Sequence, residues 1–140
     1  MKTAIKILLA AILIATTGRV ANHVEAAAKK STRVTGPNGF SFDSSSGVSN
    51  RFITPNGDTF NDTVVFTFEN PRDSAVSGSI YDLKGAEVAR LTIGPTPPSV
   101  TQSTLEWDGR MGGQAVNGGL YIYVILSEET VVSGTLVVVR

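Results

Sequence analysis

The chain has 140 residues, with 12 basic side chains, 12 acidic side chains, one histidine and no cysteine. This length allows one domain once a targeting segment is removed, and a core built by about a hundred residues can hold a fold without disulfides. The charges are balanced and form no basic patch or stripe, so we expect no nucleic-acid partner.

The N-terminus has the three parts of a secretory signal peptide. Lys2 and Lys6 supply the basic part, residues 7–15 form an apolar run, and small and polar residues follow. Nine apolar residues are too few for a membrane-spanning helix, which needs about twenty. The pattern predicts a signal peptide over residues 1–26, cleaved after its last residue, with Ala28 as the alternative site. We therefore expect an exported protein, either extracellular, on the cell surface or periplasmic.

Removal of this segment would leave nine basic and eleven acidic residues, and it would remove the only histidine, His23. A chain without histidine or cysteine cannot form a Ser–His–Asp triad, a Cys–His pair or an ordinary zinc site. Paired carboxylates or a Ser–Lys arrangement remain as catalytic routes. The acidic residues of the later strands are expected as solvated surface charges rather than paired acids (Asp82, Glu87, Glu106 and Asp108). We therefore expect no enzyme.

Residues 27–50 are rich in Ser, Gly, Thr and Lys, which predicts a flexible polar leader. Phe40 and Phe42 are apolar and alternate with Ser41. This spacing allows a short strand that is added to a sheet edge, either in this molecule or in a neighbour. Phe40 and Phe42 are therefore candidate contacts with another chain.

From residue 51 onward, β-branched and aromatic stretches alternate with turn sequences. We expect seven strands, over residues 51–54, 63–68, 77–83, 87–93, 103–107, 119–127 and 131–139. Three prolines in residues 94–99 lack an amide hydrogen, so this segment is expected to be a crossing loop. The pattern predicts an all-β, antiparallel immunoglobulin-like or fibronectin-III-like β-sandwich over residues 51–140.

Four residues are expected to be important in the core: Ile80, Trp107, Tyr121 and Tyr123. Trp107 is expected at its centre, because burying a tryptophan removes on the order of 200 Å² from water. The two tyrosines share one face of their strand, and the other face carries Leu120, Ile122, Val124 and Leu126. One tyrosine can form the hydrogen bond of a tyrosine corner. The alternative is an aromatic platform for a ligand such as a sugar.

Four oxygen-bearing side chains lie within seven residues: Asn56, Asp58, Asn61 and Asp62. Calcium takes about six to eight oxygen ligands from flexible loops, so this cluster is a candidate calcium site. The segment lacks the EF-hand pattern. The alternative is an Asx-type turn, in which these side chains accept hydrogen bonds from backbone amides. We expect no other cofactor.

Five segments in order resemble a known family: residues 53–62 (ITPNGDTFND), 80–88 (IYDLKGAEV), 107–109 (WDG), 117–123 (NGGLYIY) and 134–140 (GTLVVVR). Residues 51–140 resemble the immunoglobulin-like module of the flagellar hook-capping protein. They equally resemble the gliding-motility-associated C-terminal sorting domains of type IX secretion. The resemblance implies a seven-stranded sandwich without enzyme activity. In sorting domains the last strand and its basic end belong to the export signal, and Arg140 matches that pattern.

The strand expected over residues 131–139 carries no charged side chain. Such a strand at a sheet edge is open to pairing with another chain, so Val137, Val139 and Arg140 are candidate contacts. Internal pairing is the alternative. We expect a secreted or surface-displayed structural protein that binds other protein chains, either its own copies in a filament or an envelope or secretion assembly. The alternatives are a type IX sorting domain lacking its cargo and, less favoured, a carbohydrate-binding module.

Overall fold

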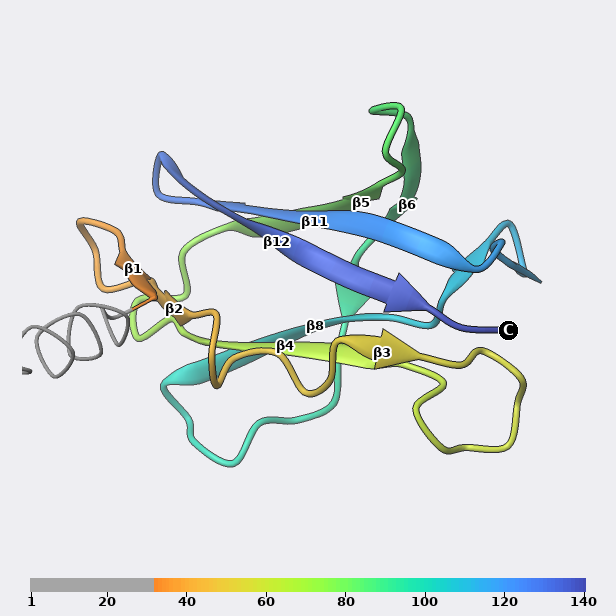
Figure 1. The fold of residues 1–140 in the computed structure, drawn as a ribbon. Helices are drawn as coiled ribbons and strands as arrows, with labels where there is room; N and C mark the ends of the chain where they lie inside the picture. Colours follow the sequence, from red (N-terminus) through yellow and green to blue (C-terminus); the bar gives the residue numbers. More distant parts are fainter. Residues whose placement is uncertain (1–31) are drawn as a thin grey trace, which may run out of the picture. The chain divides into compact units, whose positions relative to one another are not determined.

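The computed structural model describes residues 32–140, and this part of the chain is an all-β sandwich without a helix (Figure 1). The all-β fold class predicted from the sequence is therefore confirmed. The expected signal peptide, residues 1–26, and the first residues of the expected leader lie outside the described residues. Residues 32–140 contain no helix that is long and apolar enough to cross a membrane.

Within residues 32–140, two five-stranded sheets form the layers of the sandwich. The first sheet has the order β1 (Arg33–Thr35), β2 (Ser41–Asp43), β4 (Val64–Glu69), β8 (Gln102–Trp107) and β7 (Thr92–Ile93). The second has the order β3 (Phe52–Ile53), β12 (Thr130–Val138), β11 (Gly119–Ser127), β5 (Val76–Tyr81) and β6 (Glu87–Arg90). A small separate hairpin is formed by β9 (Arg110–Met111) and β10 (Gln114–Ala115).

The strand order is that of an immunoglobulin-like domain. In such domains one sheet contains strands A, B, E and D, and the other contains C, F and G. Here β2-β4-β8-β7 takes the A-B-E-D positions, and β12-β11-β5 takes the G-F-C positions, with β6 added beside C. β3 belongs to the second sheet, where it pairs in parallel with the end of β12, Phe52 beside Val137. The chain therefore changes sheet between β2 and β3.

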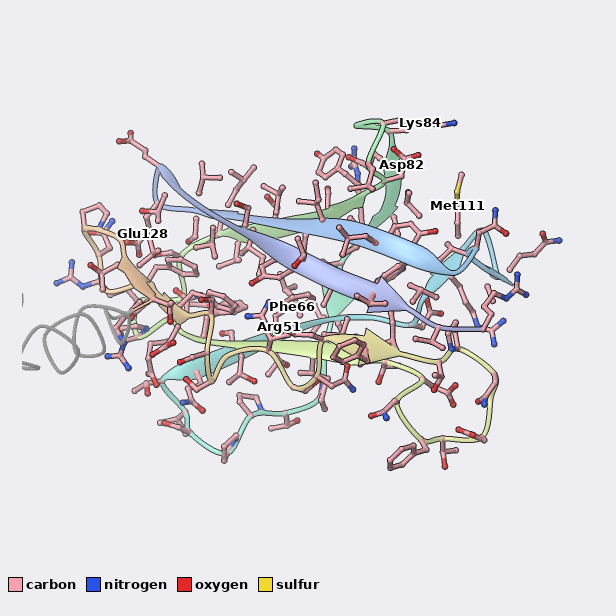
Figure 2. The ribbon with its side chains drawn as sticks, viewed as in Figure 1. Arg51, Phe66, Asp82, Lys84, Met111 and Glu128 are labelled. Carbon is pink, nitrogen blue, oxygen red and sulfur yellow. The ribbon has the colours of Figure 1, made fainter. Side chains whose placement is uncertain are left out.

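Side chains from both sheets interlock in the core. Along β4, Val64, Phe66 and Phe68 are buried, and the residues between them are half-buried. The Phe66 ring lies 4.8 Å, centroid to centroid, from the ring of Tyr123 in the opposite sheet. Figure 2 shows Phe66 between the two layers. Ile80 of β5 is also fully buried.

Trp107 is buried, but it is not the centre of the core. It is the last residue of β8, its indole N–H donates to the backbone oxygen of Arg110 at 2.9 Å, and its ring lies 5.6 Å from that of Tyr121. The largest completely buried side chains include Tyr123 and Phe66, which pack against each other across the two sheets. The tryptophan therefore packs toward one end of the sandwich, and the expectation that it occupies the centre needs correction.

Residues 32–50 belong to the sandwich, so the predicted flexible leader and the domain boundary at residue 51 need correction. The compact unit begins at Thr32. Phe40 and Phe42 are completely buried, with their rings 5.5 Å from Phe68 and 6.3 Å from Tyr123, respectively. Because both rings fill the core, they are not the contacts with another chain that the sequence predicted. β2 is the added strand that the spacing allowed, and it joins a sheet of its own molecule.

One carboxylate fastens the β1–β2 hairpin to the second sheet. Glu128, in the turn between β11 and β12, accepts hydrogen bonds from the amide of Asn38 (2.7 Å), the amide of Phe40 (3.3 Å) and the hydroxyl of Ser74 (2.5 Å). Burial acts to raise the pKa of Glu128, but these bonds and the Arg72 charge outweigh it, so the pKa lies below its ordinary value. Figure 2 labels this residue at the β1–β2 end of the molecule.

The turn that carries this carboxylate is strained. Glu128 and Glu129 have φ angles of 51° and 64°, and the flanking residues Ser127 and Thr130 are paired. Two consecutive positive φ angles are typical of a type I′ turn, in which Asn-Gly is the preferred sequence. Each left-handed residue other than glycine costs about 1–2 kcal/mol. The bonds to Glu128 offset this cost, whereas among residues 32–140 no hydrogen bond involves the side chain of Glu129.

The strand predicted over residues 87–93 is two strands in different sheets. β6 pairs with β5, but Thr92 and Ile93 pair with β8 of the first sheet. The crossing occurs at Leu91, whose amide donates to the backbone oxygen of Gly78 at 2.8 Å. The Leu91 side chain occupies the place that a Cβ on Gly78 would take. Residues 94–101 then join β7 to β8 within one sheet, so the proline segment is not the crossing loop.

Candidate functional site

The loop between β3 and β4 holds the residues predicted as candidate calcium ligands. The Asp62 carboxylate accepts hydrogen bonds from the amides of Gly57 (2.9 Å) and Thr59 (2.6 Å). The side-chain oxygen of Asn56 accepts one from the amide of Asp58 (3.0 Å), and its side-chain nitrogen donates to the Asp58 carboxylate (2.9 Å). The contact between Asn56 and the amide of Asp58 is that of an Asx-type turn, and the Asp62 carboxylate binds amides earlier in the same loop. Both satisfy the backbone of a tight loop.

The remaining candidate ligand, Asn61, accepts a hydrogen bond from the side chain of Asn50 at 3.2 Å. The amide of Gly57 has the largest effect in holding the pKa of Asp62 below its ordinary value. In the described part of the chain, no three His, Cys, Asp or Glu side chains gather in a group that could hold a metal ion. The geometry favours the turn interpretation, because the oxygens that calcium would need are bound to amides.

Tyr121 and Tyr123 point into the core, so the aromatic platform is wrong. The Tyr121 hydroxyl donates to the backbone oxygen of Asn117 at 2.8 Å, near the start of β11, which is the bond of a tyrosine corner. Within residues 32–140, the buried Tyr123 hydroxyl has no hydrogen-bond partner. Burial raises the pKa of both hydroxyls, and for Tyr123 the Arg51 charge acts in the opposite direction. The Tyr123 phenol fills the space where Gly134 lacks a side chain.

Two of the four acidic residues that could have formed catalytic pairs serve local turns. The Asp82 carboxylate accepts hydrogen bonds from the amides of Lys84 (2.8 Å) and Ala86 (3.0 Å) in the turn between β5 and β6. Asp108 accepts one from the amide of Arg110 (3.0 Å). Figure 2 shows Asp82 and Lys84 together at this turn. Asp82 and Asp108 thus act as turn-stabilising acceptors, and the absence of enzyme activity stays a prediction.

The edges of both sheets are short or occupied. β1 and β7 end the first sheet with three and two residues, and β3 and β6 end the second with two and four. The end of β12 is covered by β3, because the amides of Val137 and Val139 donate to the backbone oxygens of Arg51 and Ile53, both at 2.8 Å. Short edge strands are one of the ways in which proteins prevent strand addition. The part of this edge that contains Val137 and Val139 is therefore occupied by β3. Only residues 131–135 leave the edge of β12 open to pairing with another chain.

The second sheet presents an apolar surface to solvent on the side away from the core. We name this surface the outer face. Tyr121, Tyr123 and Ile125 point inward from β11, so the alternate residues point outward. The outward apolar side chains include Phe52, Leu120, Ile122, Val124, Leu126 and Val131. Uncharged polar residues lie beside them on the same side, namely Ser133 and Thr135 of β12 and Ser77 and Ser79 of β5.

The outer face is exposed and carries no charge along its two longest strands. Phe52 and Val131 are 63% and 61% exposed. Residues 119–127 and 130–139 contain no Asp, Glu, Lys or Arg. Val137 lies beside Phe52, and Val139 is exposed beyond the end of β12, so both candidate contacts adjoin this face. Contiguous exposed apolar surfaces in soluble proteins mark sites of protein–protein or membrane contact.

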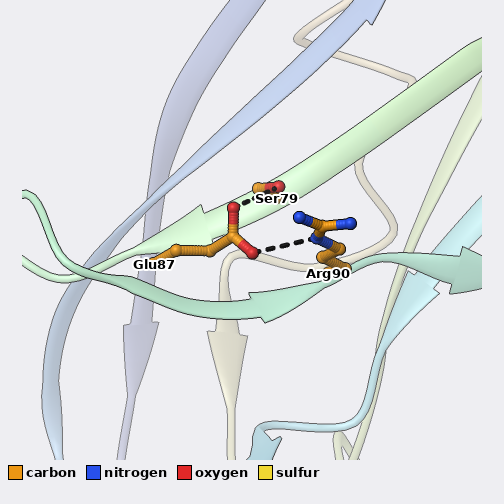
Figure 3. Close-up of polar contacts among 3 residues, drawn as sticks. All are labelled: Ser79, Glu87 and Arg90. Carbon is orange, nitrogen blue, oxygen red and sulfur yellow. Dashed lines mark hydrogen bonds and ion pairs between the residues drawn. The ribbon is translucent and has the colours of Figure 1, made fainter.

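A polar rim borders the outer face at β5 and β6. The Glu87 carboxylate accepts a hydrogen bond from the Ser79 hydroxyl at 3.3 Å and pairs with the Arg90 guanidinium at 3.0 Å (Figure 3). The two charges of this ion pair cancel, so the rim is polar but locally neutral. An apolar centre with a polar rim is the usual construction of a protein–protein interface.

The sequence pattern placed four outer-face residues of β11 on one side of their strand but predicted no role for them. Leu120, Ile122, Val124 and Leu126 alternate with Tyr121, Tyr123 and Ile125, so both sides of the strand are apolar. A strand buried on one side only is expected to alternate apolar and polar residues. The signal for the site was therefore that β11 lacks alternating polar residues. In a two-layer sandwich only one side of each strand faces the core, so the second apolar side of β11 must face solvent or a partner.

The chain was compared with protein-family models, curated proteins and solved structures, and no match was found in any of the three. The resemblance to hook-capping and type IX sorting modules therefore remains a prediction from the sequence.

Proposed function

We propose that this protein is an exported, non-enzymatic interaction module, and that its outer face is the surface that binds another protein. The charge-free apolar surface formed by β3, β11 and β12 is the observation that carries the proposal. Burying apolar surface contributes about 25 cal/mol per Å². Covering the outer face with a bound protein would therefore contribute favourably to the free energy of binding.

The structure of the edges directs the proposal to a face rather than to strand addition. The second sheet ends in β3 and β6, which are too short to template a long added strand. By contrast, β11 and β12 have nine residues each and present their whole outward side. The rim pair of Glu87 and Arg90 adds polar contacts without net charge.

The proposal is tested by placing a charge on the outer face in the producing cells. Val124 is half-buried at the middle of β11, and Val100 is a fully exposed valine in the loop before β8. After crosslinking of intact cells, we expect the wild type and Val100→Lys to migrate in the same protein complex, and Val124→Lys to migrate alone. Equal complexes for all three proteins would refute the outer face as the binding surface.

Export is tested separately by the mass of the protein recovered from its producing cells. We expect a chain that begins at Ala27, or at Lys29 if cleavage follows Ala28. Recovery from the cytoplasm with an intact N-terminus would contradict the signal peptide and the extracellular or envelope location.

A type IX sorting domain is the second candidate function. It is favoured by the C-terminal end of β12, where Val139 and Arg140 are exposed and can be reached by an export machinery. A reporter fused before residue 32 should then be exported and cleaved only in cells with that machinery, and Arg140→Glu should abolish export. Export of the reporter that does not depend on Arg140 would eliminate this candidate.

A further inference from the structure

We propose that the partner bound by the outer face is a second copy of this chain, packed face to face in a closed dimer. This inference rests on the proposed function, and it adds the identity of the partner and the symmetry of the contact. Three properties of the outer face support it: its area, its charge and its relief.

The outer face supplies about two thirds of the area that a specific dimer needs. Nine-residue strands such as β11 and β12 are about 30 Å long at about 3.3 Å per residue. The four strands from β3 to β5 span about 19 Å at about 4.8 Å each. β5 and β3 are shorter, with six and two residues, so the flat footprint of the four strands is about 400 Å² per copy and about 800 Å² for two copies. A specific interface of about 1,200 Å² therefore requires the contact to extend over β6 and the turns beside the outer face.

The charge of the outer face suits a second copy better than it suits a charged partner. A surface that meets its own copy brings like charges together near the symmetry axis, and such contacts cost several kcal/mol. β11 and β12 avoid this cost because they carry no charge. Glu87 and Arg90 at the rim already neutralise each other. Nothing along these strands would attract a nucleic acid, an acidic peptide or an anionic membrane.

The relief of the outer face is self-complementary at its centre. β11 is the middle strand of its sheet, and Val124 is near the middle of β11. The neighbours of Val124 on the two flanking strands are Ser133 and Ser79, both small. The Val124 side chain of each copy can therefore pack over the small side chains of Ser133 or Ser79 of the other copy, beside that copy's own Val124. A two-fold contact of this kind closes at two copies and does not extend into a filament.

The dimer is tested by sedimentation velocity of the full chain, expressed with its own N-terminus, over a wide range of concentrations. We expect a reversible monomer–dimer equilibrium for the wild type. Val124→Lys places like charges at the axis and should raise the dissociation constant by about a hundredfold or more. Val100→Lys adds the same charge away from the outer face and should behave as the wild type. Ser133→Lys, which removes no apolar group, should also dissociate the dimer.

The remaining outcomes overturn the inference in distinguishable ways. A monomeric wild type at every concentration excludes the second copy, and open-ended polymers exclude the closed dimer. A dimer that withstands both Val124→Lys and Ser133→Lys excludes the outer face. Binding of a monomeric wild type to phosphatidylcholine vesicles, lost in Val124→Lys, would assign the face to lipid. If the wild type is monomeric but Val124→Lys still abolishes the crosslinked protein complex in cells, the proposed function survives with a different protein partner.

Discussion

Truncating Phe42 tests whether residues 32–50 are part of the folded domain. Phe42 is completely buried in β2, and its ring meets the edge of Tyr123 from the opposite sheet at 6.3 Å. In Phe42→Ala, the lost burial and the cavity left behind together cost about 3–5 kcal/mol. For a domain of about this size, 1 kcal/mol shifts the melting temperature by about 4 °C. We therefore expect the melting temperature to fall by about 12–20 °C.

The assay is thermal unfolding followed by circular dichroism, with urea unfolding as a second measure of the free energy. Phe60→Ala is the matched control, because it removes the same ring from a position that is 72% exposed. It should change the stability by less than about 0.5 kcal/mol. If Phe42→Ala does not accumulate, Phe42→Leu provides a milder version of the same test. If Phe42→Ala and Phe60→Ala had the same melting temperature, β2 would not be part of the cooperative core.

Four further predictions concern the second sheet and its turn. Tyr121→Phe removes the bond to the Asn117 carbonyl and should lower the free energy of unfolding by about 1 kcal/mol, measured in urea. Gly134→Ala should lower it by about 1–3 kcal/mol, because a Cβ there overlaps the Tyr123 phenol, and unchanged stability would refute that packing. Glu129→Gly removes the cost of a positive φ at a residue other than glycine. It should raise the free energy of unfolding by about 1 kcal/mol, and the melting temperature by a few degrees. The pKa of Glu128 is lowered in the folded state, so its contribution to stability is present above pH 4.5 and is lost as the pH falls below that value. Glu128→Gln should therefore destabilise the protein at neutral pH, and the difference from wild type should shrink in acid; a difference independent of pH would contradict the role of the carboxylate.

The strands of the second half of the chain could be predicted because alternation is a local signal. Residues 119–127 and 131–139 were expected as strands, and β11 and β12 occupy Gly119–Ser127 and Thr130–Val138. The tyrosine corner was foreseen as one alternative for the same reason, since it joins residues only four positions apart. Where contacts lie close in sequence, residue type and spacing are sufficient.

The errors concern contacts between distant residues. Phe40 and Phe42 are nearly isolated among polar residues, and their burial depends on Phe68 and Tyr123, which lie far along the chain. Likewise, alternation over residues 87–93 tells which side chains share a side but not which sheet the strand joins, so the crossing at Leu91 gave no signal. The tyrosine side of β11 was correctly expected in the core, but the exposure of its opposite side was not foreseen. A strand that is apolar on both sides is also typical of a strand covered on both faces, so the pattern alone does not show that one side faces solvent.

The most direct test of the account uses a single cysteine on the outer face. The chain has no cysteine, so Ser133→Cys and Val100→Cys each introduce the only thiol, one on the outer face and one in a distant loop. The rate of maleimide labelling is measured for both variants, in the assembly on the producing cells and in dilute purified protein. We predict that labelling at position 133 is slowed in the assembly and that labelling at position 100 is not. Equal rates at position 133 in the two states would contradict the claim that the outer face is the contact surface.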